Sequence, residues 1–264
     1  MSSRSEHSRR SEQPRRTSPG VSFEPTDTQK YDHLDAAADA VRKALIRADV
    51  ECLFIGGYAA TLLGSNRLTE DVDMVVSREC LNRLVETGSF ARTSDDRLLF
   101  QFRGRKVYID LHVGMSRIKN FPIPQPSVLR SLTVGIGGGT LKSRPLLRDS
   151  RLYILHPEIL LYTKLIPWAR ASFSTRQDAV RKAQKHIQDV IAIATWLVTT
   201  KCVIEWSKFR GYSNDDFLWL LGYVYRKSTE MRPLVAQIIS PDDMKTALTI
   251  SIDMKRGKSA IFQS

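Results

Sequence analysis

The sequence predicts an α+β fold, in which a mixed β-sheet is followed by a helical region. Up to about residue 155, short β-rich runs alternate with helix-length segments, whereas from Pro157 onward apolar residues recur at helical spacing. The first 25 residues fit neither pattern. We therefore expect a basic tail over 1–25, an α/β domain over 26–155 and a helical domain over 156–264.

The tail is rich in Ser, Arg and Pro and nearly free of large apolar side chains. Because it can bury too little surface to offset the entropy lost on ordering, we expect it to be disordered. Its Arg and Ser content is also typical of a mitochondrial transit peptide, but Glu6, Glu12 and the lack of an amphipathic pattern argue against one.

The charge balance of the chain favours polyanionic partners. The 264 residues include 40 Lys and Arg against 28 Asp and Glu, a formal net charge of +12. Nucleic acid is the first partner to consider, and a basic tail with ordinary surface lysines and arginines is the alternative. No apolar run approaches the ~20 residues that span a membrane. Three widely spaced cysteines form neither a zinc pattern nor a disulfide framework, which favours a reducing compartment, cytoplasmic or nuclear.

The first elements of the predicted domain are a packing helix and a buried strand. Residues 27–48 carry apolar side chains at helical spacing. The apolar face consists of Leu34, Ala37, Ala38, Val41, Ala44 and Leu45. The run Cys52–Ile55 is short and apolar, as in a buried strand. Gly56 and Gly57 follow, where a backbone without Cβ atoms can approach a ligand and a short helix over 58–63 can offer N–H groups to phosphate.

Two carboxylates open the next predicted strand, Asp71–Val76. Residues two apart in a strand point to the same face, so Asp71 and Asp73 lie side by side while Val72 and Met74 point into the core. Carboxylates this close repel each other unless a cation lies between them. Hard oxygen ligands suit Mg²⁺ or Mn²⁺ better than zinc, so the pattern predicts a divalent-metal site.

A third carboxylate follows on a later strand. Residues 78–87 predict a helix closed by Gly88, and the runs 97–103 and 106–113 predict a hairpin that turns at Gly104-Arg105. Asp110 lies on the polar face of the second run and is the only acidic residue between positions 96 and 149. His112 shares this face, where a solvent-facing position is the expectation and a place near the site is the alternative.

These residues resemble the signature of the DNA polymerase beta nucleotidyltransferase superfamily: Gly-Gly after an apolar residue, about a dozen residues, then Asp-x-Asp on a strand. The stretch GGYAATLLGSNRLTEDVDMVV is more specifically similar to AbiEii-type and related small nucleotidyltransferases, where a glycine, an arginine and a threonine precede the aspartate pair. Gly64, Arg67 and Thr69 stand at those positions. In this superfamily a third carboxylate on a neighbouring strand completes the metal site, and Asp110 matches it.

The resemblance implies a mixed-sheet nucleotidyltransferase domain that transfers an NMP from an NTP to a hydroxyl group. Asp71, Asp73 and Asp110 would be catalytic and bind Mg²⁺ or Mn²⁺. The nucleotide would be bound by Gly56, Gly57, Arg67, Thr69, Lys164 and Asp189. The last two come from a weaker match, to a helical lysine and a Lys-Asp-x-x-Asp pattern that residues 185–189 fit in part. A lysine whose charge reaches solvent is the alternative for Lys164.

The remaining segments predict structure rather than chemistry. Residues 114–127 contain three prolines and predict a loop. The glycines at 137–139 lack both P-loop and G-x-G-x-x-G spacing and predict a hairpin turn. A strand is expected over 151–155, and helices over 158–169, 174–199, 215–225 and 241–250.

Three functions stay open at this point. Transfer to RNA, for example to a tRNA end, is favoured by the basic charge. Transfer to a small hydroxylated compound or a protein side chain would instead require an enclosed acceptor pocket. A non-catalytic nucleotide- or RNA-binding module with the same fold is the third. The three carboxylates argue against it, whereas the imperfect match over 185–189 argues for it. No protein partner is indicated.

Overall fold

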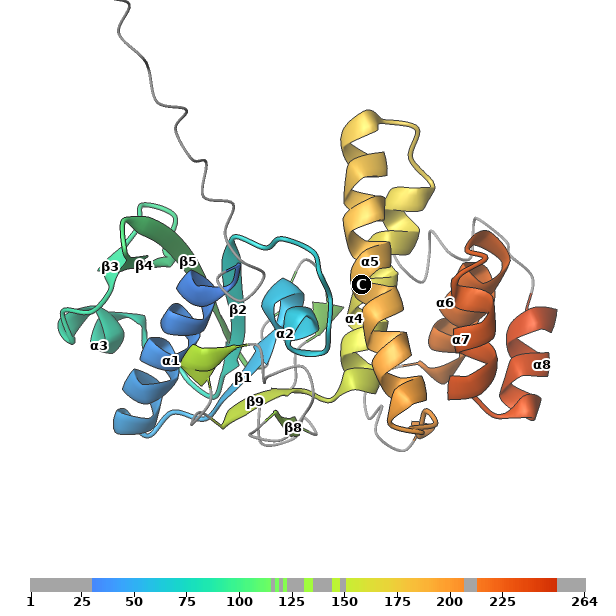
Figure 1. Ribbon diagram of the computed structural model, residues 1–264, viewed down its shortest axis with the longest axis horizontal. Coiled ribbons are helices and arrows are strands. Elements are labelled where there is room, and N and C mark those ends of the chain that lie inside the picture. Colours follow the sequence, from blue (N-terminus) through green and yellow to red (C-terminus); the bar gives the residue numbers. More distant parts are fainter. Residues whose placement is uncertain are drawn as a thin grey trace, which may run out of the picture.

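The computed structural model describes residues 30–114, 117–118, 121–122, 131–134, 144–147, 151–206 and 213–250. The expected tail over 1–25 and the expected turn at 137–139 lie outside these residues. The described part of the chain contains a mixed sheet flanked and followed by helices, which confirms the predicted α+β class (Figure 1).

The main sheet has seven strands in the order β3-β4-β5-β2-β1-β9-β8 within the described residues. Their bounds are Cys52–Ile55 for β1, Asp71–Val76 for β2, Ala91–Arg92 for β3, Leu98–Phe102 for β4, Arg105–Val113 for β5, Ser131–Val134 for β8 and Leu152–Leu155 for β9. Strand β2 runs parallel to β5 and β1 runs parallel to β9, and the other neighbours are antiparallel. The sheet is therefore mixed, as predicted.

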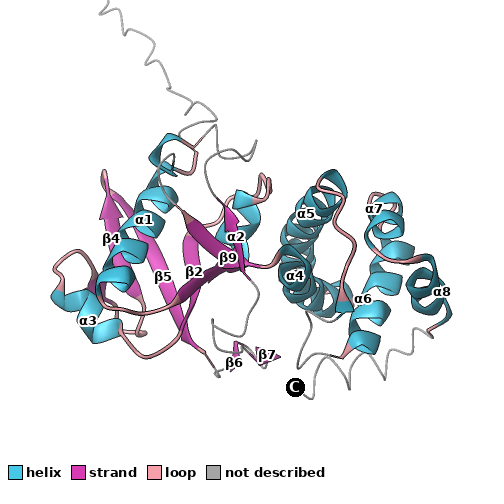
Figure 2. Ribbon diagram, turned by 90° about the horizontal axis from the view of Figure 1, so that it is seen from below, coloured by secondary structure: helices cyan, strands magenta, loops and turns pink. Residues whose placement is uncertain are grey.

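Helix α1, Asp32–Arg47, packs on one face of this sheet (Figure 2). Its predicted apolar face is buried, and it contacts β2, β4 and β5. Val72 and Met74 of β2 are fully buried. Because side chains alternate along a strand, the other face of β2 carries the two aspartates.

Helix α2, Gly56–Leu62, begins directly after β1 and two residues earlier than predicted. Ile55 is still extended, and Gly56 has a φ of +70°. Glycine adopts this left-handed conformation without the steric penalty that other residues meet, so the chain passes from strand to helix at one residue.

The β4–β5 hairpin is confirmed, but its turn is Arg103-Gly104 and not Gly104-Arg105. Phe102 pairs with Arg105, which leaves Arg103 and Gly104 in the turn with φ of +49° and +77°. A two-residue hairpin turn of this type needs positive φ at both positions, and glycine is favoured at the second. The predicted turn is one residue too late.

The segment predicted as a loop over 114–127 contains two short strands, which corrects that prediction. Arg117–Ile118 (β6) pairs with Phe121–Pro122 (β7) in a separate two-stranded sheet. Two-residue strands carry no side-chain periodicity, so the prolines dominated the prediction.

The remaining helices are α3 Leu81–Glu86, α4 Pro157–Ser172, α5 Gln177–Thr199, α6 Asn214–Lys227, α7 Met231–Ile238 and α8 Pro241–Thr249. Helices α4 and α5 lie side by side next to the sheet and contact α2, while α6, α7 and α8 lie beyond them (Figures 1 and 2). Helix α7, which contains Pro233, was not predicted from the sequence. The proline occupies the first turn, where the backbone N–H needs no helical partner. No described helix is long and apolar enough to cross a membrane.

Candidate metal and nucleotide site

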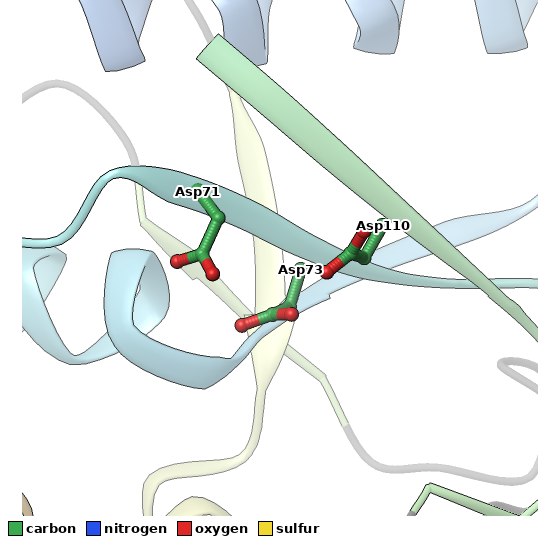
Figure 3. Close-up of side chains that lie close together, drawn as sticks. All are labelled: Asp71, Asp73 and Asp110. Atoms are coloured by element: carbon green, nitrogen blue, oxygen red, sulfur yellow. The ribbon is translucent and has the colours of Figure 1, made fainter. Parts of the chain in front are cut away.

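Asp71, Asp73 and Asp110 lie together on the face of the sheet away from the buried Val72 and Met74 (Figure 3). Strands β2 and β5 are parallel neighbours, and their register places Asp73 opposite Asp110. One carboxylate oxygen from each aspartate lies within 4.8 Å of the other two. Three converging carboxylates are a donor set that fits Mg²⁺ or Mn²⁺.

The three carboxylates are partly accessible, with side-chain exposures of 41% for Asp71, 25% for Asp73 and 26% for Asp110. The pKa of Asp110 is raised, chiefly because the protein partly desolvates it; the hydrogen bond and charge of Arg97 oppose this effect, and the charges of Asp73 and Asp71 add to it. A group that resists ionisation beside two like charges marks a place where a cation is stabilised.

Gly56 brings the start of α2 against Asp73. A Cβ atom at this glycine would lie 1.9 Å from Asp73 Oδ2. The predicted approach to a phosphate ligand stays a prediction; in this structure the group that lies close to Gly56 is the Asp73 carboxylate.

Gly57 likewise lies in close contact with the loop that leads into β2. A Cβ atom there would lie 2.3 Å from Arg67 Nη2 and 2.7 Å from Thr69 Oγ1. The Thr69 hydroxyl donates to Asp71 Oδ1 at 2.8 Å. Thr69 therefore orients a carboxylate of the candidate metal site, and Arg67 lies directly over the glycine turn.

A buried anion joins this loop to the helices. Asp189 of α5 is completely buried, and its Oδ2 lies 2.9 Å from Lys164 Nζ of α4. Its Oδ1 accepts hydrogen bonds from Arg67 Nε at 3.1 Å and from Ser65 Oγ at 2.8 Å. Lys164 is only 6% exposed, so the alternative of a lysine whose charge reaches solvent is wrong.

Two cations thus share one carboxylate, so the cluster of Lys164, Arg67 and Asp189 carries one surplus positive charge. Ser65 was not predicted as a site residue, because its position directly after Gly64 gave no signal for a partner on a distant helix. Lys185 is exposed on α5. His112 Nε2 lies 3.8 Å from Asp73 Oδ1, so this histidine borders the site, while its side chain remains 25% exposed to solvent.

Arg97 is a further residue of the site that was not predicted from the sequence. Its Nε and Nη2 both donate to the Asp110 carboxylate, the second contact being 3.1 Å, and Nη2 lies 3.9 Å from Asp71 Oδ2. The pair Leu98–Ile109 ends the observed β4–β5 register, and one position further Arg97 lies in line with Asp110. The turn predicted one residue late would have placed a different residue there.

Comparisons with known proteins place this fold in a class. No family model and no curated protein matches the sequence. Among solved structures, an antigenic nucleotidyltransferase-like protein from Paracoccidioides brasiliensis matches with a TM-score of 0.60 and 18% identity, over 79% of this chain and 94% of that chain. This chain therefore has the fold of a nucleotidyltransferase-like protein.

More distant matches include two structures of ANT(2'')-Ia. A solution structure of this antibiotic-resistance factor has a TM-score of 0.34 and 12% identity, over 63% of this chain and 92% of that chain. A crystal structure in complex with adenylyl-2''-tobramycin has a TM-score of 0.35 and 11% identity, over 63% of this chain and 98% of that chain.

Proposed function

We propose that this chain is a metal-dependent nucleotidyltransferase that transfers an NMP from an NTP to a hydroxyl group, with RNA as the favoured acceptor. The observation that carries this proposal is the convergence of Asp71, Asp73 and Asp110 from two adjacent parallel strands of a nucleotidyltransferase-like fold. The narrower likeness to AbiEii-type enzymes is part of the proposal and rests on the sequence motif alone.

The three aspartates would hold Mg²⁺ or Mn²⁺. Such ions, when bound, polarise phosphoryl oxygens and lower the pKa of a hydroxyl nucleophile. Thr69 fixes the Asp71 carboxylate through its hydroxyl hydrogen bond. Gly56 lets the backbone lie against Asp73. In this arrangement Asp110 would receive or steer the proton of the acceptor hydroxyl.

The triphosphate would lie at the glycine turn. The space that a side chain at Gly57 would fill is occupied by the Arg67 guanidinium and the Thr69 hydroxyl, so this glycine lets Arg67 lie against the turn, where it would meet a phosphate. Lys164 and Arg67 share the single charge of Asp189, so the cluster carries a surplus positive charge toward an anionic ligand. Asp189 would thereby position the two cations rather than touch the nucleotide itself.

RNA is the favoured acceptor because exposed basic residues continue from this cluster. Lys185 and Lys182 lie about one and two turns N-terminal to Asp189 on the same side of α5, and both are exposed. Lys106 is exposed at the start of β5, four residues before Asp110 and on the same face of the strand. A polyanionic acceptor would find positive charge on both the sheet and the helix side of the site.

One observation favours a second candidate, a non-catalytic binding module. Arg97 already neutralises part of the carboxylate charge through its contacts with Asp110. A site whose counter-charge is an arginine could keep the fold without turnover.

Incubation of the purified protein with Mg²⁺, each α-labelled NTP in turn and total tRNA tests the proposal. An Asp71→Ala, Asp73→Ala double variant removes two carboxylates, and Asp215→Ala, at an exposed position of α6, is the matched control. We expect label in RNA with the wild type and the control, and none with the double variant.

The other outcomes separate the candidates. Label released as mononucleotide, with RNA untouched, would retain the chemistry and replace the acceptor with a small molecule or a protein. No turnover of any NTP, with Mg²⁺ or Mn²⁺, would contradict the enzyme and favour the binding module.

A further inference from the structure

Arg97 places a positive charge on the carboxylates that form the candidate metal site. Its Nε and Nη2 occupy both oxygens of Asp110, which is the bidentate geometry in which a guanidinium binds a carboxylate most firmly. Whichever Asp110 oxygen serves as a metal ligand, Arg97 therefore contacts it already. The guanidinium and a divalent cation compete for the same atoms.

The backbone of Arg97 is fixed beside the site. Its N–H donates to Thr93 Oγ1 at 3.0 Å, and its carbonyl accepts from the N–H and the hydroxyl of Thr93 at 2.9 and 3.0 Å. These three contacts close the turn between β3 and β4. The first atoms of the Arg97 side chain therefore start from a defined point next to Asp110.

The guanidinium has a second partner besides the carboxylates. Its central carbon lies 4.7 Å from the centre of the Tyr108 ring, within the range of a cation–π contact. Tyr108 pairs with Asp71 in the β2–β5 register. The Arg97 side chain is only 28% exposed. These contacts hold the Arg97 side chain in a defined position within the site.

We propose that Arg97 is the resident counter-ion of the carboxylate site and that a divalent cation enters by displacing its guanidinium from Asp110. The inference rests on the proposed function, because it assumes that the three aspartates bind the metal. Arg97 neutralises the mutual repulsion of the aspartates in the metal-free protein and so weakens metal binding to the free enzyme. Release of the guanidinium leaves Tyr108 and solvent as its partners.

Mn²⁺ titration without nucleotide, followed by the EPR signal of free Mn²⁺, tests this directly. Arg97→Ala removes the competitor, Arg97→Gln keeps the length of the side chain without its charge, and Arg97→Lys keeps a charge without the planar fork. Arg92→Ala is the matched control, because Arg92 pairs with Asp96 in the same segment and its side chain is 46% exposed. The Asp71→Ala, Asp73→Ala change, introduced beside Arg97→Ala, identifies binding at the carboxylates.

We expect Arg97→Ala and Arg97→Gln to bind Mn²⁺ about tenfold more tightly than the wild type, a difference of about 1.4 kcal/mol. Arg97→Lys should lie between them and the wild type, Arg92→Ala should match the wild type, and the aspartate changes should abolish the binding. If Arg97→Ala does not fold, Arg97→Gln gives the same test with a smaller change in packing.

The contrary outcomes are distinct. Equal or weaker Mn²⁺ binding by the Arg97 variants, still lost on removal of the aspartates, would overturn this inference and leave the proposed metal site intact. No Mn²⁺ binding at the aspartates in either the wild type or the Arg97 variants would overturn both.

Discussion

Gly56 shows how closely the site depends on single residues. Its φ of +70° turns the chain from β1 into α2, and its missing side chain leaves room for the Asp73 carboxylate. Gly104, in the β4–β5 turn, has a similar φ of +77°, but a Cβ atom there would meet nothing within 4 Å. A side chain at Gly104 would therefore cause backbone strain alone, whereas a side chain at Gly56 would cause the same strain and a steric clash with Asp73.

Substitution of these glycines gives a matched pair. Gly104→Ala should lower the free energy of unfolding by about 1–2 kcal/mol through backbone strain alone, and leave Mn²⁺ binding unchanged. Gly56→Ala adds a methyl group 1.9 Å from Asp73 Oδ2, so it should destabilise more and abolish Mn²⁺ binding. Urea unfolding and Mn²⁺ titration of both variants measure the two effects. Normal Mn²⁺ binding by Gly56→Ala would refute the close approach.

The candidate carboxylates were predictable from the sequence because each depends on a local rule. Asp71 and Asp73 follow from the alternation of a strand, and Asp110 is a lone acid on a later apolar strand. Arg97 was not predictable, because its position opposite Asp110 depends on the hairpin register. A turn shifted by one residue shifts the partner by two, and the predicted turn places Leu99 opposite Asp110.

At the scale of elements, Asp189 links three segments that are distant in sequence. It lies on α5, and its partners lie on α4 and on the loop between α2 and β2. Each partner is a polar side chain with little exposure, so the buried carboxylate needs all of them to offset its desolvation. The glycine turn and the helices are thereby held in one arrangement.

Asp189→Asn removes this charge and leaves two partly buried cations without an anion. We expect a loss of about 3–5 kcal/mol in the free energy of unfolding, measured by urea denaturation. Asp96→Asn is the matched control, because that aspartate pairs with Arg92 at 70% exposure and should cost less than about 1 kcal/mol. Similar small losses for both variants would show that Asp189 is not the link between these elements.

The predicted elements agree with the structure where an element is long enough for its pattern of apolar and polar side chains to repeat. Strand β2 has the predicted bounds, and α1 buries the predicted face. Strands of two residues, such as β3, carry no period, and the eight-residue helix α7 was not predicted. The pairing of Lys164 and Arg67 on one carboxylate depends on how helices pack on the sheet, which no local pattern specifies.

At the scale of the molecule, exposed lysines continue the positive charge of the Asp189 cluster along α5. Lys182 and Lys185 extend the Asp189 side of α5 away from the buried cluster, about 10 Å and 6 Å along the helix axis. Both are exposed, as are Lys201 near the other end of α5 and Lys245 on α8. These two pairs of lysines have equal charge but differ in their distance from the carboxylates.

Charge reversal of these pairs tests whether RNA binds along α5 next to the candidate site. Lys182→Glu with Lys185→Glu should weaken binding of labelled tRNA, measured by fluorescence anisotropy in EDTA. It should also reduce the slope of log affinity against log salt by about 0.7–0.9 for each phosphate that the protein no longer neutralises. Lys201→Glu with Lys245→Glu changes the net charge equally and should have a much smaller effect. Equal weakening by both pairs would mean that RNA responds to total charge, and no weakening by the first pair would remove α5 from the acceptor path.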